Sequence, residues 1–209
     1  VELSLSAATG IGTSAAHLQT SVAKLEALNS TSGGMYVLEA TALEITGSNL
    51  TPGINLGGTS GAMSLVLTTG DLTVSEAIQS TASGSGVGNM LVQTLAGAVN
   101  VQANVTSNAG NVSVLSSTGI NLGTVSSAQI TATAAGKSAE IVAASGNVTM
   151  SSTSGLTATN SGTLRVMASG DIVLGQLNAG TGAAGLVMST TTLRCGMAGA
   201  GQKNIGIEA

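Results

Sequence analysis

The chain has 209 residues and a formal net charge of −4, and 43% of its residues are hydrophobic while only 7% are charged. Its five bases form no stripe and its single aromatic residue is Tyr36, which argues against a nucleic-acid-binding surface. The hydrophobic content is too high for a disordered chain. No apolar run approaches the roughly 18 residues that a membrane-spanning helix needs. We therefore expect a folded protein with a narrow aliphatic core.

The segment 15–28 is compatible with two structures. Leu18, Val22, Leu25 and Leu28 have helical spacing, and this pattern predicts a short helix that would cap one end of the fold. The alternative is a further coil of strands. We expect the coil, because of a family resemblance of residues 1–50 that is described below.

After this segment, one short phrase keeps returning along the chain. It consists of an apolar strand, a glycine, an Asp or Asn, and a second alternating strand. The clearest copies contain Gly70-Asp71, Gly146-Asn147 and Gly170-Asp171, with a shorter copy at Gly110-Asn111 and a looser one around Gly97. Self-similarity at a period of a few tens of residues is typical of a solenoid.

The valines before the turn glycines give an estimate of the coil length. Their intervals are 26, 22, 28, 24 and 21 residues, with a mean of about 24. These valines are Val66, Val92, Val114, Val142, Val166 and Val187. With Val37 as an earlier member, we predict seven or eight coils of roughly 21–28 residues.

Within a coil, apolar and polar residues alternate. Val99, Val101 and Val105 would take one face of their strands, while Asn100 and Asn104 take the other. A period of two predicts half-buried strands. Successive coils would stack such strands in parallel, about 4.8 Å apart. The sequence therefore predicts an all-β fold, a parallel β-helix or β-solenoid.

We interpret the repeated Gly-Asp and Gly-Asn pairs as structural turns. Gly tolerates positive φ, and an Asp or Asn side chain can hydrogen-bond the backbone of its own turn. The predicted turn residues are Gly70, Asp71, Gly110, Asn111, Gly146, Asn147, Gly170 and Asp171.

Carboxylates are the main candidates for chemistry, because some β-helices are polysaccharide-active enzymes with clustered acids. The candidates are Glu39, Glu44, Glu76 and Glu140. We expect these glutamates on a solvated outer face. His17 has no nucleophile motif beside it.

Metal ligands are also lacking in the sequence pattern. We interpret Cys195 as an apolar strand residue without metal-binding partners. The calcium motif Gly-Gly-x-Gly-x-Asp is absent. No catalytic residue, metal site or cofactor is predicted.

Threonine supports a second alternative, an ice-binding solenoid. Thr131, Thr133, Thr157 and Thr159 form two Thr-x-Thr pairs. Ice binding would require the same pair on the same strand of every coil. Other polar residues stand at the equivalent places, so we expect Thr to serve as a strand-forming surface residue.

Four stretches near the N-terminus carry a family resemblance: residues 3–13, 18–27, 33–37 and 42–47. They resemble the repeat unit of filamentous-haemagglutinin-type proteins, which are large secreted bacterial surface proteins. The later Gly-Asp and Gly-Asn phrases look like shorter coils of the same class. The resemblance implies a right-handed parallel β-helix, secretion and an adhesive role. It also implies strands in residues 18–27.

We thus expect residues 1–209 to form one β-solenoid domain, with a longer unit in 1–50 and shorter coils in 51–209. The start at Val1 rather than Met indicates a processed protein or a part of a longer one. The expected function is non-enzymatic: a shaft segment of a bacterial adhesin, or a surface-fibre subunit that assembles through the solenoid ends. The expected partners are copies or further repeats of the protein, and surface glycans.

Overall fold

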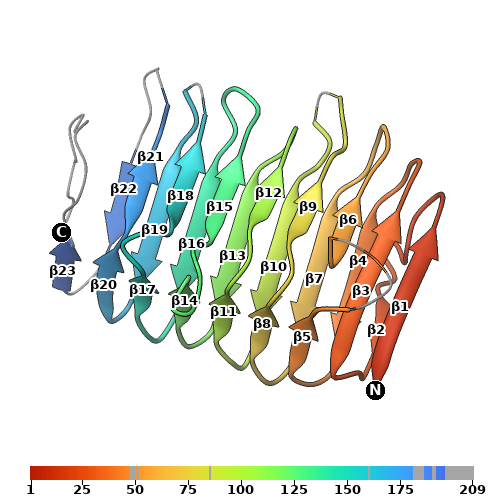
Figure 1. The fold of residues 1–209 in the computed structure, drawn as a ribbon, viewed down its shortest axis with the longest axis horizontal. Coiled ribbons are helices and arrows are strands. Elements are labelled where there is room, and N and C mark those ends of the chain that lie inside the picture. Colours follow the sequence, from red (N-terminus) through yellow and green to blue (C-terminus); the bar gives the residue numbers. More distant parts are fainter. Residues whose placement is uncertain are drawn as a thin grey trace.

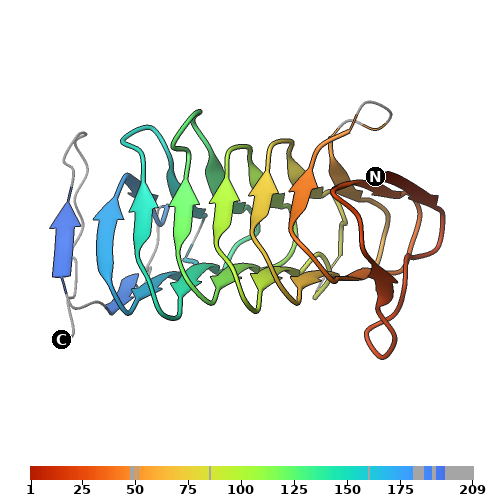
Figure 2. The ribbon, with the colours of Figure 1, turned by 90° about the horizontal axis from the view of Figure 1, so that it is seen from below.

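The computed structural model describes residues 1–47, 50, 52–84, 86–159 and 161–180, and the backbone of 186–189 and 192–195. These residues form 23 strands and no helix. Every strand pairing is parallel, and the chain winds into a β-solenoid of about seven turns (Figure 1). Figure 2 shows the coils stacked along a single axis. The predicted fold class is confirmed.

Three flat faces surround the core. The first face is an 8-stranded sheet, and the second and third faces are the two arms of a 15-stranded sheet. The strands of the first face are β2 (Leu18–Thr20), β4 (Met35–Glu39), β7 (Met63–Leu67), β10 (Met90–Thr94), β13 (Val112–Ser116), β16 (Ala139–Ala143), β19 (Leu164–Ala168) and β22 (Leu186–Ser189).

The two arms of the larger sheet share one strand at the N-terminal end. This strand is β3 (Lys24–Asn29), whose first half pairs with β5 and whose second half pairs with β6. The second face contains β5 (Leu43–Ile45), β8 (Leu72–Val74), β11 (Val99–Val101), β14 (Ile120–Leu122), β17 (Val148–Met150), β20 (Asp171–Leu174) and β23 (Thr192–Cys195). The third face contains β6 (Ile54–Leu56), β9 (Ile78–Ser80), β12 (Val105–Ser107), β15 (Gln129–Ala132), β18 (Gly155–Ala158) and β21 (Gln176–Asn178). The remaining strand, β1 (Glu2–Ala7), pairs with β3.

The segment 15–28 forms strands. β2 and most of β3 occupy it, so the expected coil is confirmed and the capping helix is not formed. The leucines with helical spacing do not share one face, as they would in a helix. Leu25 and Leu28 lie on opposite sides of β3, with Leu25 in the core and Leu28 partly exposed.

Successive coils are in register along the first face. The residues that pair in its first column are Met35, Met63, Met90, Val112, Ala139 and Leu164. The resulting coil lengths are 28, 27, 22, 27 and 25 residues, which lie within the predicted range.

The valine alignment, however, is wrong by one residue in three coils. Strand pairing aligns Val92, Val114 and Val166 with positions 65, 141 and 188. Val66 and Val142 are each one position too late, and Val187 is one position too early. A shift of one residue moves a strand side chain to the other face of the sheet. Val66 and Val142 accordingly lie on the outer surface and are partly exposed.

The inward side chains of the three faces form one hydrophobic cluster that contains no aromatic ring. Leu65, Leu72 and Ile130, one from each face, are fully buried. Burying one such side chain stabilises the fold by about 1.5–3 kcal/mol, and each coil repeats the contact. The core is therefore a narrow column of aliphatic side chains, as the composition predicts.

The corner between the first and second faces requires glycine because the coils approach closely there. A Cβ on Gly97, Gly146 or Gly170 would fall well inside van der Waals contact of the preceding coil. Of the predicted turn glycines, only Gly70 has a positive φ, of 83°. The expected reason, a left-handed backbone, is therefore wrong for Gly110, Gly146 and Gly170.

The Asp and Asn side chains at this corner also act between coils. Asp71 Oδ1 accepts a hydrogen bond from the backbone N of Ala98 at 2.8 Å. Asn147 Oδ1 accepts one from the backbone N of Asp171 at 2.8 Å. The donor belongs to the following coil in each case, and not to the same turn as the sequence analysis expected. These side chains therefore join successive coils.

The shorter phrase lies at a different corner. Gly110 and Asn111 connect β12 on the third face to β13 on the first face. Asn111 Oδ1 again accepts from the next coil, from the backbone N of Ser138 at 2.9 Å. Gly70, Gly146 and Gly170 all lie at the corner between the first and second faces, and Gly170 N donates to Gly146 O at 2.9 Å.

Replacement of Gly146 by Ala tests the close approach. The added Cβ would overlap the carbonyl oxygen of Thr118, so we expect Gly146→Ala to lower the free energy of unfolding by about 1–3 kcal/mol. Gly119→Ala is the matched control at the same corner, because its Cβ would lie 3.3 Å from the nearest backbone oxygen. Thermal or urea unfolding followed by circular dichroism measures both. Equal losses for the two variants would contradict the packing argument.

Candidate interaction surfaces

The outward side chains of the second and third faces are mainly polar. On the second face, Asn121 Nδ2 donates to Asn100 Oδ1 at 2.9 Å, so amides of neighbouring coils form a ladder. On the third face, the central outward positions from β6 to β21 are Asn55, Gln79, Thr106, Thr131, Thr157 and Asn178. The threonine column thus spans three coils and is flanked by the amides of Gln79 and Asn178, so other polar residues stand at the equivalent places of the remaining coils.

The first face carries aliphatic side chains on its outside. One outward row contains an aliphatic residue in five of the six coils from β4 to β19, with Gln93 as the exception. We call this the aliphatic row: Leu38, Val66, Leu115, Val142 and Met167. All five side chains are partly exposed. Leu95, which continues the outward side of β10 at the edge of this face, is 52% exposed.

On the described outside of the first face, from β4 to β19, charge is confined to one ion pair. Glu140 and Arg165 are neighbours across β16 and β19, and the guanidinium Nη1 of Arg165 pairs with Glu140 Oε1. Ser113 Oγ also donates to Glu140 at 3.0 Å. Of the four candidate glutamates, Glu140 therefore lies on an outer face, with its charge compensated.

Glu39 contradicts the expectation of a solvated outer face. It is the last residue of β4, points inward and has no exposed surface. Both carboxylate oxygens lie 3.1 Å from the backbone N of Val22, and Oε1 also accepts from the backbone N and the hydroxyl of Thr41 at 3.1 and 3.0 Å. Glu39 therefore satisfies backbone donors that the corner would otherwise leave unpaired.

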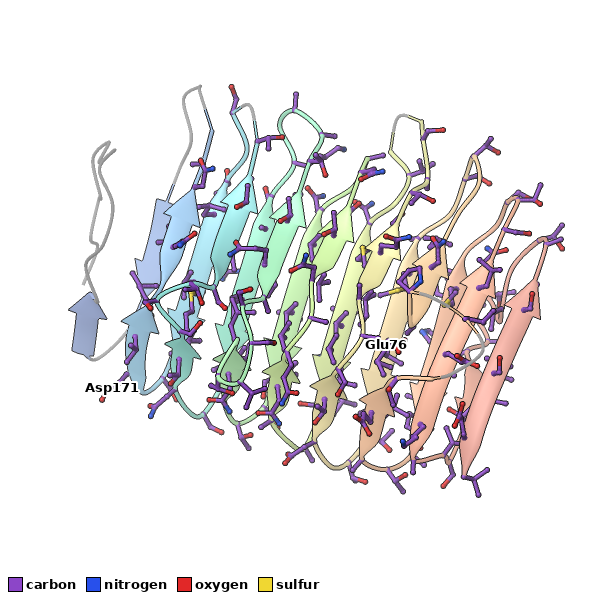
Figure 3. The ribbon with its side chains drawn as sticks, viewed as in Figure 1. Glu76 and Asp171 are labelled. Atoms are coloured by element: carbon purple, nitrogen blue, oxygen red, sulfur yellow. The ribbon has the colours of Figure 1, made fainter. Side chains whose placement is uncertain are left out.

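The other candidate acids are dispersed. Glu44 lies on the outside of the second face and accepts a hydrogen bond from Ser75 Oγ at 2.7 Å. Glu76 and Asp171 are many coils apart along the solenoid (Figure 3). Among the described residues, no group of three or more His, Cys, Asp or Glu is placed to hold a metal. The side chain of Cys195 lies outside the described part.

A second buried carboxylate, Glu26, was not singled out by the sequence analysis. It points outward from β3 but has no exposed surface, because the β5–β6 connection packs over it. Glu26 Oε2 accepts from the backbone N of Leu50 at 2.8 Å. Glu76 contacts the same connection at Gly53, and its Oε2 is buried without a hydrogen-bond partner. These acids shape the corner between the second and third faces.

A notch of about 370 Å³ opens at the corner between the third and first faces. Its floor is the short connection at Asn108 and Ala109, and longer connections before β10 and β16 form its walls. The lining includes the polar residues Thr81, Ser83, Asn108 and Lys137. The notch can offer hydrogen-bond donors and one cation to a small polar group.

The N-terminal coil is one open end of the described core. β1 pairs only with β3, and β2 pairs only with β4. Leu3 and Leu5 point inward in register with Leu25 and Ala27, yet they are partly exposed while those partners are fully buried. The outer edges of β1 and β2 thus present unpaired main-chain groups beside open aliphatic side chains.

His17 is held against the first face rather than in a catalytic constellation. Its Nε2 lies 3.2 Å from Ser64 Oγ, and its ring meets Tyr36 edge to face at a centroid distance of 5.6 Å. Tyr36 and Ser64 are outward neighbours on β4 and β7. The segment before β2 therefore covers part of that surface.

No protein-family model, curated protein or solved structure matches the chain. Within the described residues, the structure contains no helix that is long and apolar enough to cross a membrane. The fold, a parallel β-solenoid with chemically different faces, is what the structure establishes.

Removal of the Glu39 carboxylate tests its role in the corner. We expect Glu39→Ala to cost about 2–4 kcal/mol of unfolding free energy, because it leaves the backbone N–H groups of Val22 and Thr41 without their acceptor. Glu44→Ala removes a carboxylate from the same coil but from the outer surface, and it should cost much less. Chemical unfolding of both variants gives the comparison. A smaller loss for Glu39→Ala than for Glu44→Ala would refute the assignment.

Proposed function

We propose that the protein is a non-enzymatic, extracellular structural solenoid: a shaft segment of a bacterial surface adhesin or a subunit of a surface fibre. Its role is mechanical extension and display, with contacts to surface glycans or other partners through exposed turns and faces. The open N-terminal coil carries the proposal, because a repeat unit cannot bury its own apolar face without a neighbouring unit.

The unpaired edges of β1 and β2 favour extension by another parallel coil. Such a coil would supply hydrogen-bond partners to both edges and would cover Leu3 and Leu5. A further repeat of the same protein or another copy can provide it. The resemblance of residues 1–50 to filamentous-haemagglutinin-type repeats supports the extracellular setting, where long solenoids serve as shafts.

Substitution on β1 tests assembly through this end. We expect the purified protein to lengthen along the solenoid axis as its concentration rises, from single rods of about 35–40 Å. Leu5→Lys places a charge at the open core and should abolish this lengthening, whereas Ser6→Lys on the outward side of β1 should preserve it. Small-angle scattering and electron microscopy measure the length. Single rods at every concentration would rule out assembly through the ends, and the shaft-segment role would then be preferred.

A further inference from the structure

The aliphatic row on the first face marks a lateral interface. A sheet face that meets water normally carries polar outward residues, and the second and third faces follow this rule. The first face departs from it in five coils, and Leu95 adds a largely exposed leucine at its edge. We propose that a second copy of this chain packs against the first face and forms a side-by-side pair.

The regular spacing of the outward side chains favours a second copy of the chain over a different partner. The outward side chains recur with the strand spacing of about 4.8 Å, and another solenoid face presents rows with the same spacing. The side chains of the two aliphatic rows can therefore interdigitate from coil to coil. An irregular surface would match only a few rows.

Electrostatics also permits the pairing. The outward positions from β4 to β19 contain one acid and one base, Glu140 and Arg165, and these pair with each other. The net charge of −4 is carried elsewhere on the chain. Two first faces can therefore approach without the like-charge repulsion that would oppose contact through a charged surface.

The size of the face sets the strength of the pair. The six five-residue strands from β4 to β19 cover roughly 29 Å by 16 Å, or about 460 Å² per copy and about 900 Å² in total. This total is below the size of stable specific interfaces and is typical of weak, transient ones. The pair is therefore expected to be reversible and to depend on concentration.

The order of residues in the row fits a two-fold axis. An axis between β10 and β13 would place Leu38 opposite Met167 and Val66 opposite Val142 of the other copy. These four residues then meet aliphatic partners, and Leu115 meets Gln93 of the other copy, so the row is matched to itself as a two-fold interface requires. The two solenoids would run antiparallel.

Sedimentation equilibrium with two lysine variants tests the interface. Leu115→Lys should weaken the pair by at least about tenfold, because it buries a charge in an apolar contact. Asn121→Lys is the matched control, since it lies outward on the second face of the same coil and should leave the pair unchanged. Thermal melts confirm that both variants fold. A parent protein that is monomeric at all concentrations, or equal weakening by both variants, would overturn the proposal.

Cross-linking tests whether the first face is the interface, in a Cys195→Ser background. A short bis-maleimide should join two copies of the double variant Val66→Cys, Val142→Cys, because facing sheets lie about 10 Å apart. The matched control is Thr73→Cys, Thr149→Cys, which places the same two coils' thiols outward on the second face. Equal cross-linking of control and test variants would exclude the first face as the interface. The result does not depend on assembly through the ends, because Leu5→Lys should leave lateral pairs intact.

Discussion

Parallel main-chain pairing between successive coils is the constraint on which the rest of the structure depends. Each strand of the described core aligns residue by residue with the strand one coil away, so inward positions repeat as columns. Because neighbouring strands are only about 4.8 Å apart, a column accepts side chains of similar width and needs no aromatic ring to fill it. The composition, rich in Val, Ile, Leu and Ala, follows from this geometry.

The same close stacking explains the corners. Where the first face turns into the second, the backbone of one coil lies against the backbone of the next, and a side chain at Gly146 or Gly170 has no room. At the same corner, Asp71 and Asn147 accept hydrogen bonds from backbone N–H groups of the following coil. Corner residues thus extend the inter-coil ladder beyond the strands, and connections that bulge away from the axis can vary in length.

The sequence predicts the fold because alternation and the repeated turns both follow directly from the ladder. It predicts register less well. In Leu65-Val66 and Ile141-Val142 both residues are aliphatic, so hydrophobicity alone does not show which one faces the core. In the structure, the second residue of each pair points outward. These doublets are also the sequence signal for the aliphatic row. The prediction of an outer position for Glu39 is wrong for a different reason. Its inward position depends on the backbone N–H groups of Val22 and Thr41, which are available at this one corner.

The outward rows carry the information about function, because the solenoid constrains them least. An inward residue must fit its column in every coil, whereas an outward residue needs only to tolerate a strand. On the second and third faces this freedom is used for amides and threonines, which meet water. On the first face it is used for aliphatic residues in coil after coil, at a hydration cost of roughly 25 cal/mol for each Å² left exposed. Exposed aliphatic residues are unfavourable in an isolated rod, yet here they recur in register from coil to coil. A second copy, whose residues recur with the same spacing, would cover them and explain the pattern.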